Sequence, residues 1–378
     1  MGFRLAMVTP YPEIPGIITG GVEGVSYCLI EGFKRVAELD IHVIAPAYHR
    51  PEGRELRDSI TIHWLKVGVL PAFVANFSTM RKRVQQCLKD LNPEVTHFQG
   101  QASWLPGYKK PCVLTVHGIF ERDLLYRGGA FLSLRRSLIS WSECQGRRQA
   151  KEIILISPYV LEEIGSQLPG RHWDIENPVT QDFFEVNRSG NQPRILFVGR
   201  IGKRKNVDGL LRAFTRVRRR VPEAVLHIAG KTESSAYADD CRSFVSGNGL
   251  DRSVRFLGNI SRDELIQELT HARCLTLVSH QETAPMIIEE AMASGVPVVA
   301  SNICGLPYMV DEGRTGFLVS PADEVQIADR LVALLEDDVL NNHMREQCRA
   351  VALERFHTDN VARKTMQVYL SMLAGRNY

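Results

Sequence analysis

The sequence predicts an α/β protein with two domains, each built on a doubly wound parallel sheet. Its 378 residues exceed what one hydrophobic core of typical size accommodates. Short apolar runs alternate with amphipathic helical stretches, a pattern typical of parallel sheets covered by helices. The polar segment Asn187–Pro193 interrupts this alternation, and a second series of the same kind follows it. We therefore expect an N-terminal domain over residues 1–188 and a C-terminal domain over residues 189–357.

Short apolar runs bounded by turn residues predict the strands. In the first half they are Phe3–Thr9, Ile41–Ala45, Ile60–Val67, Val95–Phe98, Cys112–Val116 and Ile153–Ile156. In the second half they are Arg194–Val198, Val225–Ala229, Val254–Leu257, Cys274–Val278 and Pro297–Ala300. Ligands of such sheets bind at the carboxyl ends of the strands. The loops that follow these runs are therefore the places to search for a site.

The composition argues against a nucleic-acid-binding, a membrane-spanning and a secreted protein. The chain is 44% hydrophobic and 24% charged, and its net charge of +3 is too small to indicate nucleic-acid binding by itself. No apolar stretch approaches the roughly 20 residues that span a bilayer. Met1–Val8 is expected to be a first strand rather than a signal peptide. The eight cysteines include no Cys-x-x-Cys pair, which favours reduced thiols, a cytoplasmic protein and no metal site.

Two carboxylates, Glu282 and Glu290, flank the start of a predicted helix. Pro285 is expected at the first helical position, and Gly295 follows the helix end. Glu290 then lies about 8 Å along the helix axis. Carboxylates so placed suit hydroxyls at the two ends of a ligand, and the free N–H groups between them favour phosphate, as a nucleotide sugar requires. Spacing alone favours a simpler interpretation, a surface helix with two solvated glutamates.

The same segment resembles the signature of retaining glycosyltransferases of family four, which have the GT-B fold. Their pattern is Glu, seven residues, Glu and then Ala-Met-Ala-x-Gly-x-Pro-Val-Val-Ala, which Glu282, Glu290 and Ala291–Ala300 match. Other family landmarks follow in the same order over nearly the whole chain, among them a turn and strand at Gly313–Val319. The family usually has Phe-Gly where this chain has Ala284-Pro285. Because Pro has no N–H, one backbone donor of the family's site is missing here.

The resemblance implies a GT-B architecture, in which two Rossmann-like domains face each other across a cleft. Residues 1–188 would form the acceptor side, with the C-terminal helix 358–378 packed back on it, and residues 189–357 would bind the nucleotide sugar. The implied activity is transfer of a hexose from a UDP- or GDP-sugar to a hydroxyl of a glycan, lipid-linked or small-molecule acceptor. It implies retention at the anomeric carbon, with no metal and no cofactor.

Glycines and cations mark two candidate phosphate loops. Gly20 and Gly21 open a predicted helix, where a backbone approaches a ligand closely, although most Gly-Gly pairs are only turns. Arg200 and Lys205 lie between a strand and a helix, where phosphates bind. A solvated basic cluster is the alternative, because the two residues before Lys205 are also basic. The resemblance implies that both loops contact the donor diphosphate.

The remaining candidates depend more heavily on the resemblance. It implies that Glu282 acts on the donor sugar without being a nucleophile and that Glu290 holds the ribose. His117 ends a predicted strand, and the resemblance implies contact with the transferred sugar and acceptor; a His that merely caps the strand is the alternative. His97 is expected to be scaffold. Further implied donor contacts are Thr283, Ala284, Met286 and Ile287 at the helix mouth, and Asn259 and Ile260 beside the base.

A basic amphipathic stretch, Phe131–Ala150, suggests a surface for membranes. Its arginines alternate with Leu, Ile and Trp, and together with Arg81–Arg83 it would form a patch at the inner membrane surface. The alternative is a helix that packs its apolar stripe into the core and leaves a basic face in water. The resemblance leaves both interpretations open, because some relatives act on lipid-linked acceptors.

Two other functional classes are compatible with the sequence. One is a sugar-nucleotide epimerase or a phosphorylase-like enzyme on the same architecture. Phosphorylases carry a Lys-bound pyridoxal cofactor that absorbs visible light, and an epimerase needs no acceptor. The other is a catalytically silent protein that binds a nucleotide sugar or a membrane surface, for which the Ala284-Pro285 departure is the relevant feature.

Overall fold

A computed structural model describes residues 2–68, 79–126, 132–187 and 192–375. The chain forms two compact units. Unit 1 consists of Met1–Pro178 together with Thr358–Tyr378, and unit 2 of Val179–His357. Within the described ranges, no helix is both long enough and apolar enough to cross a bilayer.

Unit 1 contains an eight-stranded sheet in the order β3-β4-β2-β1-β5-β6-β7-β8. The strands are β1 (Arg4–Val8), β2 (Asp40–Ala47), β3 (Gly53–Arg57), β4 (Ile60–Lys66), β5 (Val95–Gln99), β6 (Cys112–Val116), β7 (Glu152–Leu155) and β8 (Arg171–Asp174). Every pairing is parallel except that of β3 with β4. Because both faces are covered, strands such as β5 and β6 are buried along their whole length.

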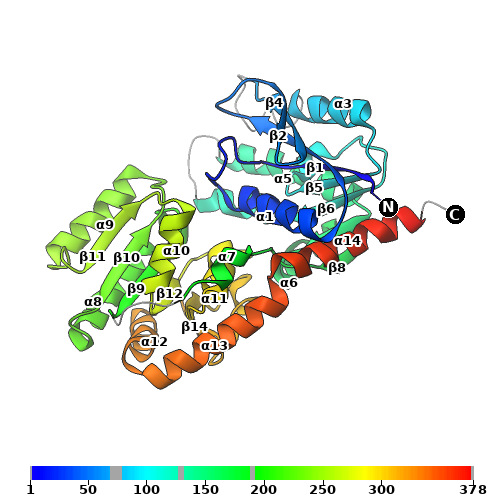
Figure 1. Cartoon of the computed structure of the whole chain (residues 1–378). Coiled ribbons are helices and arrows are strands. Elements are labelled where there is room, and N and C mark those ends of the chain that lie inside the picture. The colour runs from blue at the N-terminus through cyan, green and yellow to red at the C-terminus, as the bar shows by residue number, and fades with distance from the viewer. Residues whose placement is uncertain (1, 69–78, 127–131, 188–191, 376–378) are drawn as a thin grey trace. The chain divides into compact units, whose positions relative to one another are not determined.

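The helices of unit 1 alternate with these strands along the chain, and the C-terminal helix packs with them. They are α1 (Gly21–Val36), α3 (Arg81–Leu91), α4 (Phe120–Asp123), α5 (Leu132–Gln149), α6 (Pro158–Ile164) and α14 (Thr358–Ala374), with single turns η2 (Ala102–Trp104), η3 (Leu124–Tyr126) and η4 (Gly165–Gln167). α14, red in Figure 1, packs against α1, and Tyr369 contributes to the same core as Phe33. The C-terminal helix thus completes the core of unit 1.

Unit 2 contains a six-stranded, all-parallel sheet in the order β11-β10-β9-β12-β13-β14. The strands are β9 (Arg194–Val198), β10 (Val225–Ala229), β11 (Val254–Gly258), β12 (Cys274–Leu277), β13 (Val298–Ser301) and β14 (Gly316–Val319). The helices are α7 (Gln181–Phe184), α8 (Val207–Arg220), α9 (Ser235–Gly247), α10 (Arg262–His271), α11 (Met286–Ala293), α12 (Glu324–Glu336) and α13 (Asp338–Arg355), with turns η5 (Lys203–Lys205) and η6 (Leu306–Tyr308). The predicted α/β class with two Rossmann-like sheets is confirmed.

The two units divide between Pro178 and Val179, earlier than the linker composition suggested. Phe183 in α7 is buried in the core of unit 2, which explains why the division precedes α7. The expected linker Asn187–Pro193 lies largely outside the described residues.

Each sheet has a point at which the strand order reverses, because successive strands are added first on one side of a central strand and then on the other. β1 lies between β2 and β5, and β9 lies between β10 and β12. Successive connections leave opposite faces at such a point, so the loops diverge there and create space for a ligand. The loops after β9 and β12 in unit 2, and those after β1 and β5 in unit 1, therefore locate the candidate sites.

Two strands, β3 and β8, were not anticipated from the sequence. β3 has the sequence Gly-Arg-Glu-Leu-Arg at a sheet edge, with Leu56 exposed and no apolar run. β8, Arg-His-Trp-Asp, is a short edge strand with no buried residue. Edge strands need no continuous apolar run, because they lack a neighbour on one side.

We predict that Gly32→Ala destabilises the protein by about 1–3 kcal/mol. A methyl group at Gly32 of α1 would lie 2.7 Å from Thr358 Cγ2 and 2.8 Å from Ala362 Cβ in α14. The control is Gly247→Ala at the end of α9, where a methyl group meets nothing within 4 Å. Chemical denaturation measures both variants. Equal midpoints for the two would contradict the tight α1–α14 packing.

Candidate functional site

The loops that follow β9 and β12 meet at the reversal point of unit 2. Lys205 and Arg204, from the turn after β9, both contact the carboxylate of Glu282 in the loop after β12. Lys205 Nζ pairs with one carboxylate oxygen, and Arg204 Nη1 lies 3.2 Å from the other. The site thus has at its centre a buried carboxylate with a cation on each oxygen.

The charges that surround Glu282 determine the protonation state of its carboxyl group. Burial acts to raise the pKa of its carboxyl, but Lys205 and Arg204 outweigh burial and hold that pKa below its usual value. Glu282 is therefore ionised at neutral pH. Its main chain is also held, because its carbonyl accepts a hydrogen bond of 3.0 Å from Gly305 N–H.

The turn η5 is shaped to hold Lys205 inside the protein. Gly199 leaves room for the lysine, since a methyl group there would lie 3.2 Å from Lys205 Cε. Asn206 follows with a left-handed φ of 54° and donates to Val278 O (3.0 Å) and Pro321 O (2.8 Å). These bonds fasten the turn after β9 to the segment after β12 and to the segment after β14.

Arg204 was not selected from the sequence, where it counted only as part of a solvated basic cluster. It instead donates to Gln281 O at 2.7 Å, and its own carbonyl accepts from His280 N–H at 2.8 Å. The signal available in the sequence was its position next to Lys205, but the sequence could not indicate which way the side chain turns.

Arg200, the other predicted cation, lies in the same loop but apart from this carboxylate. Its side chain is 51% exposed, and its Nη1 lies 3.8 Å from Glu233 Oε1. The structure therefore brings Lys205 and Glu282 together and leaves Arg200 at the surface, where it is accessible to a ligand.

The N-terminus of α11 adjoins Glu282 in the sequence. The helix begins at Met286 with Pro285 as the N-cap, not at Pro285 as expected, and no side chain caps it. Thr283 and Ile287 are buried, whereas Met286 and the preceding Ala284 are half-buried. An uncapped helix start presents N–H groups that favour an anion.

Glu290 lies one turn further along α11 and is half-buried. Burial raises the pKa of its carboxyl to about 7; Asp182 adds to this rise and Arg262 opposes it. Arg262 of α10 grips Asp182 of α7 through bonds of 2.8 Å and 2.7 Å. Glu290 thus belongs to a cluster of α7, α10 and α11, separate from the Glu282 carboxylate.

Asn259 and Ile260 lie between β11 and α10. Asn259 is exposed and Ile260 half-buried, and Gly258 before them has a φ of +70° that favours glycine. Both side chains keep exposed surface at the carboxyl edge of the unit 2 sheet.

In unit 1, one backbone N–H of the Gly20-Gly21 pair is already engaged in a hydrogen bond within the protein. Gly20 is the N-cap of α1, and its N–H donates to the buried carboxylate of Glu23 at 3.1 Å. Thr19 Oγ1 donates to the same oxygen at 2.7 Å. Of the pair, Gly21 is therefore the more accessible residue.

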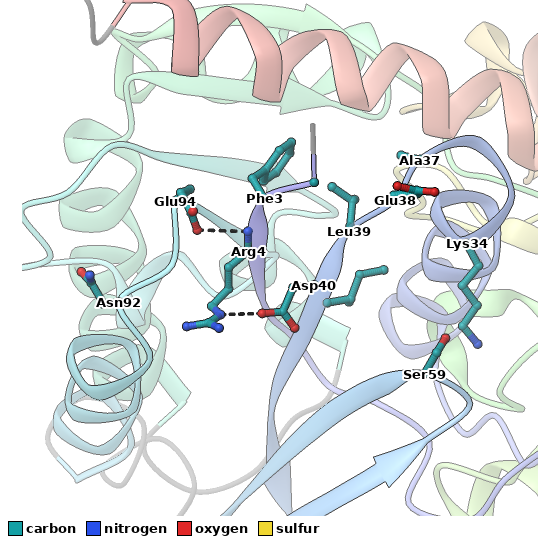
Figure 2. Close-up of a pocket in the computed structure, with 12 residues that line it drawn as sticks. Phe3, Arg4, Lys34, Ala37, Glu38, Leu39, Asp40, Ser59, Asn92 and Glu94 are labelled. Carbon is teal, nitrogen blue, oxygen red and sulfur yellow. Dashed lines mark hydrogen bonds and ion pairs between the residues drawn. The ribbon is translucent and has the colours of Figure 1, made fainter.

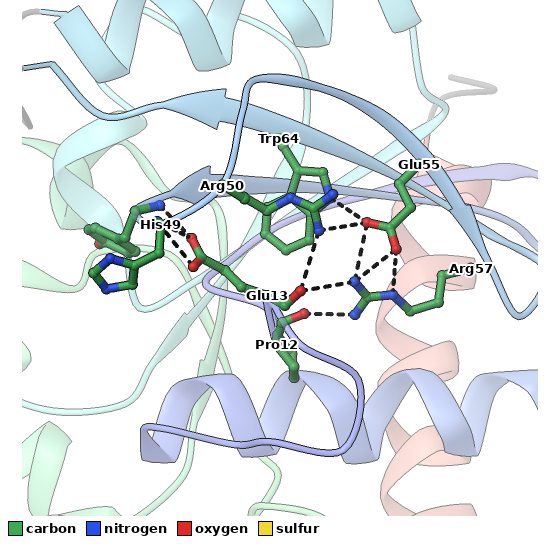
Figure 3. Close-up of polar contacts among 8 residues, drawn as sticks. Pro12, Glu13, His49, Arg50, Glu55, Arg57 and Trp64 are labelled. Carbon is green, nitrogen blue, oxygen red and sulfur yellow. Dashed lines mark hydrogen bonds and ion pairs between the residues drawn. The ribbon is translucent and has the colours of Figure 1, made fainter.

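The loop before this pair is held by a cluster on the edge hairpin (Figure 3). Arg57 of β3 donates to Pro12 O at 2.7 Å, and Glu55 accepts from the indole N–H of Trp64 at 2.8 Å. The guanidinium of Arg50 lies over Trp64, 4.1 Å from the ring centroid. The unanticipated strand β3 therefore anchors the segment between β1 and the glycines.

His117 follows the carboxyl end of β6, an interior strand of the unit 1 sheet. Its Nε2 lies 2.5 Å from Gln99 Oε1, and burial lowers the pKa of its imidazole to about 4. His97, expected to be scaffold, is wholly buried between Tyr369 and Thr115. His117 is half-buried and Gln99 is fully buried.

A cavity of about 840 Å³ lies at the opposite edge of the unit 1 sheet (Figure 2). Arg4 and Asp40, at the amino ends of β1 and β2, form an ion pair of 2.7 Å in its wall, and Glu94 accepts from Arg4 N–H at 3.0 Å. These charges satisfy one another, and the edge is not the one at which parallel sheets bind ligands.

Comparison with known proteins identifies the family. The model for Glycosyltransferase Family 4 matches residues 19–179, and that for Glycosyl transferases group 1 matches residues 179–351. A D-inositol 3-phosphate glycosyltransferase of Corynebacterium diphtheriae is 32% identical over 392 residues, covering 91% of this chain and 89% of that protein. The chain belongs to glycosyltransferase family 4.

Other members of the family are similar over different lengths. A glycogen synthase of Mycobacterium tuberculosis is 33% identical over 279 residues, 71% of this chain. The match spans only 65% of that relative.

Solved structures bear out the GT-B fold of this family member. Sucrose-phosphate synthase of Thermosynechococcus elongatus superposes with a TM-score of 0.83 at 18% identity, over 99% of this chain and 100% of that one. HepE of Anabaena, solved with UDP and glucose, gives 0.74 at 16% identity, over 98% and 100%. At these identities the likeness concerns the fold.

Within the described ranges, no group of three or more His, Cys, Asp or Glu side chains is arranged to hold a metal ion.

We predict that Glu282→Gln destabilises the protein by roughly 3 kcal/mol while it strengthens anion binding. The substitution removes the charge that Lys205 and Arg204 share, so both cations become available to a ligand. Thermal unfolding with and without pyrophosphate measures both effects. Glu233→Gln, which removes the more exposed partner of Arg200, is the control and should lose less stability. Weaker pyrophosphate protection in Glu282→Gln than in wild type would contradict this arrangement.

Proposed function

We propose that this family 4 member transfers a hexose from a nucleotide-diphosphate sugar to a hydroxyl acceptor, with retention at the anomeric carbon. The observation that carries the proposal is the buried Glu282 carboxylate with Lys205 and Arg204 on its two oxygens, next to the uncapped start of α11. Positive charge concentrated at a loop between a strand and a helix suits a diphosphate.

In the proposed reaction, the bond between the anomeric carbon and the β-phosphate oxygen breaks, and negative charge develops on the diphosphate. Lys205, Arg200 and the N–H groups of Met286 and Ile287 stabilise that charge as it forms. The acceptor hydroxyl attacks from the face that the diphosphate leaves, and its proton passes to a departing phosphate oxygen. These groups supply the positive charge, so the proposed mechanism requires no metal.

Glu282 takes a specific part in this mechanism. Since a cation contacts each of its oxygens, it is poorly placed to act as the nucleophile of a double displacement. We assign it to orienting the two cations and to countering positive charge on the sugar ring. Glu290 would hold the ribose hydroxyls, and Asn259 and Ile260 the base.

The remaining assignments follow the family. Thr283, Ala284 and Gly21 would contact the donor, with Gly20 shaping the loop, and His117 would contact the transferred sugar. HepE was solved with UDP and glucose, and separately with UDP-glucose, which supports a UDP-sugar donor here, with a GDP-sugar as the second candidate. Relatives named glycogen synthase and D-inositol 3-phosphate glycosyltransferase differ in acceptor, so we propose only a hydroxyl acceptor.

A thermal-shift screen against UDP- and GDP-sugars tests the proposal. We expect one donor to raise the melting temperature of the wild type through mass action and to be consumed with a suitable acceptor. Arg200→Ala should abolish both effects without unfolding the protein, because this side chain is half exposed. Lys203→Ala, an exposed cation of the same turn, is the control and should behave as wild type.

Three outcomes would contradict transfer. Conversion of the nucleotide sugar without an acceptor would identify an epimerase, and visible cofactor absorbance would favour a phosphorylase-like enzyme. Binding with neither nucleotide release nor product would identify a silent binding protein.

We also propose that α5 contacts an anionic membrane surface. Leu134, Leu138 and Trp141 are 59%, 39% and 60% exposed, so these three side chains do not pack into the core as the simpler interpretation expected, whereas Leu132 and Ile139 are half-buried. Arg136 and Arg148 are exposed on the same helix. Arg147, in contrast, is buried against Glu121 at 2.7 Å and does not belong to this surface. Apolar side chains flanked by arginines suit an interface with anionic lipid.

Sedimentation with vesicles tests the α5 surface. We expect the wild type to sediment with vesicles that contain phosphatidylglycerol and not with phosphatidylcholine alone, because the arginines require anionic lipid. The double substitution Leu138→Ser and Trp141→Ser should weaken binding at least about tenfold. Leu370→Ser, which replaces a leucine 53% exposed on α14, is the control. Equal binding by both variants would contradict the assignment.

A further inference from the structure

His117 and Gln99 meet at the carboxyl ends of two neighbouring strands. Gln99 ends β5 and pairs in register with Thr115 of β6, two residues before His117. Its side chain is 1% exposed, and its Oε1 lies 2.5 Å from His117 Nε2. An amide oxygen can only accept a hydrogen bond, so Nε2 must carry the proton.

Gly100 holds the same edge of the imidazole. It has a left-handed φ of +71°, and a methyl group there would lie 3.2 Å from His117 Cδ2. Cδ2 and Nε2 form one edge of the ring, and Nδ1 lies on the other. The main chain after β5 therefore packs against the Cδ2–Nε2 edge, and Nδ1 lies on the other side of the ring. Nδ1 forms no hydrogen bond with any residue that the structure describes.

The charge state of His117 is set by its surroundings. Burial lowers the pKa of its imidazole to about 4, so the ring is neutral at physiological pH. The nearest titratable neighbour on β5 is His97, whose pKa burial lowers to about 3, with a smaller contribution from His117. His97 is held separately, by Tyr369 Oη at 2.6 Å and Thr115 Oγ1 at 2.7 Å.

We infer that Gln99 is a positioning residue that holds His117 as the Nε2–H tautomer and so presents the Nδ1 lone pair to the ligand. A neutral ring with a lone pair accepts a hydrogen bond and gives no attraction to an anion. The ligand group at His117 is therefore a donor, a hydroxyl or an amide N–H, and not a carboxylate or a phosphate. The statement about the ligand depends on the proposed function; the statement about the tautomer does not.

Nuclear magnetic resonance of ¹⁵N-histidine in the full chain tests the tautomer directly. A His117→Asn spectrum assigns the signals. We expect wild-type His117 at pH 7.5 to have a protonated Nε2 and an unprotonated Nδ1. Gln99→Leu should remove this preference and populate the Nδ1–H form. Gln101→Leu, which changes a half-buried glutamine in the same loop, is the control and should leave His117 unchanged.

A second variant covers the case in which Gln99→Leu does not fold. Gln99→Glu keeps an acceptor at the same place but adds a charge, so it should retain the Nε2–H tautomer and raise the pKa of His117 by at least about one unit. The His97 signals report whether the core around Tyr369 is intact. A protonated Nδ1 in the wild type, or an unchanged tautomer in folded Gln99→Leu, would overturn the inference.

Kinetics test the consequence for the ligand. Using the nucleotide sugar selected by the thermal-shift screen, Gln99→Leu should lower kcat/KM about tenfold. In Gln99→Glu the acid limb of the rate profile should move to higher pH, because protonated His117 has no lone pair, and activity should recover above the new pKa. A limb that stays in place would overturn the assignment of the lone pair to the ligand. Failure of every variant and the wild type to transfer sugar would count against the proposed function alone, since the spectra decide the tautomer separately.

Discussion

The contact of one buried carboxylate with two cations organises unit 2. Burying Glu282 without a counter-charge would be very costly, and Lys205 in turn could not remain buried without Glu282. Each loop at the reversal point of the sheet therefore depends on the other for its position. The same contact keeps a lysine and an arginine fixed and charged near a helix N-terminus, which is consistent with the diphosphate site proposed above.

In unit 1, neutral histidine side chains are fixed near the carboxyl ends of the strands, where unit 2 has charged side chains. His97 and His117 are both held uncharged by burial, and each has a defined partner for its ring nitrogen. The C-terminal helix contributes Tyr369 to this arrangement, so the end of the chain helps to fix the core beside His117. A cationic site and a neutral one suit different chemical groups, anions for the first and neutral hydrogen-bond donors for the second.

Most of the fold followed from local patterns. β6, β9 and β10 have the predicted bounds, because the mostly buried strands of a parallel sheet favour continuous apolar runs. The edge strands β3 and β8 escaped prediction because an edge makes no such demand. Likewise, Leu138 and Trp141 have the sequence spacing of core residues, although both are exposed. Hydrophobic periodicity shows that a helix has an apolar face, but it does not show whether another element covers that face.

The sequence by itself determined the alternation of strands and helices, the family signature and the spacing of Glu282, Glu290, Arg200 and Lys205. Only the tertiary structure decided that Lys205 is buried with Glu282, that Arg204 joins them and that Arg200 stays exposed. It also decided that Glu23 occupies the N–H of Gly20 and that Gln99 contacts His117. The physical reason is that charge pairing and tautomer choice depend on contacts between side chains, and many of these join loops far apart in the sequence.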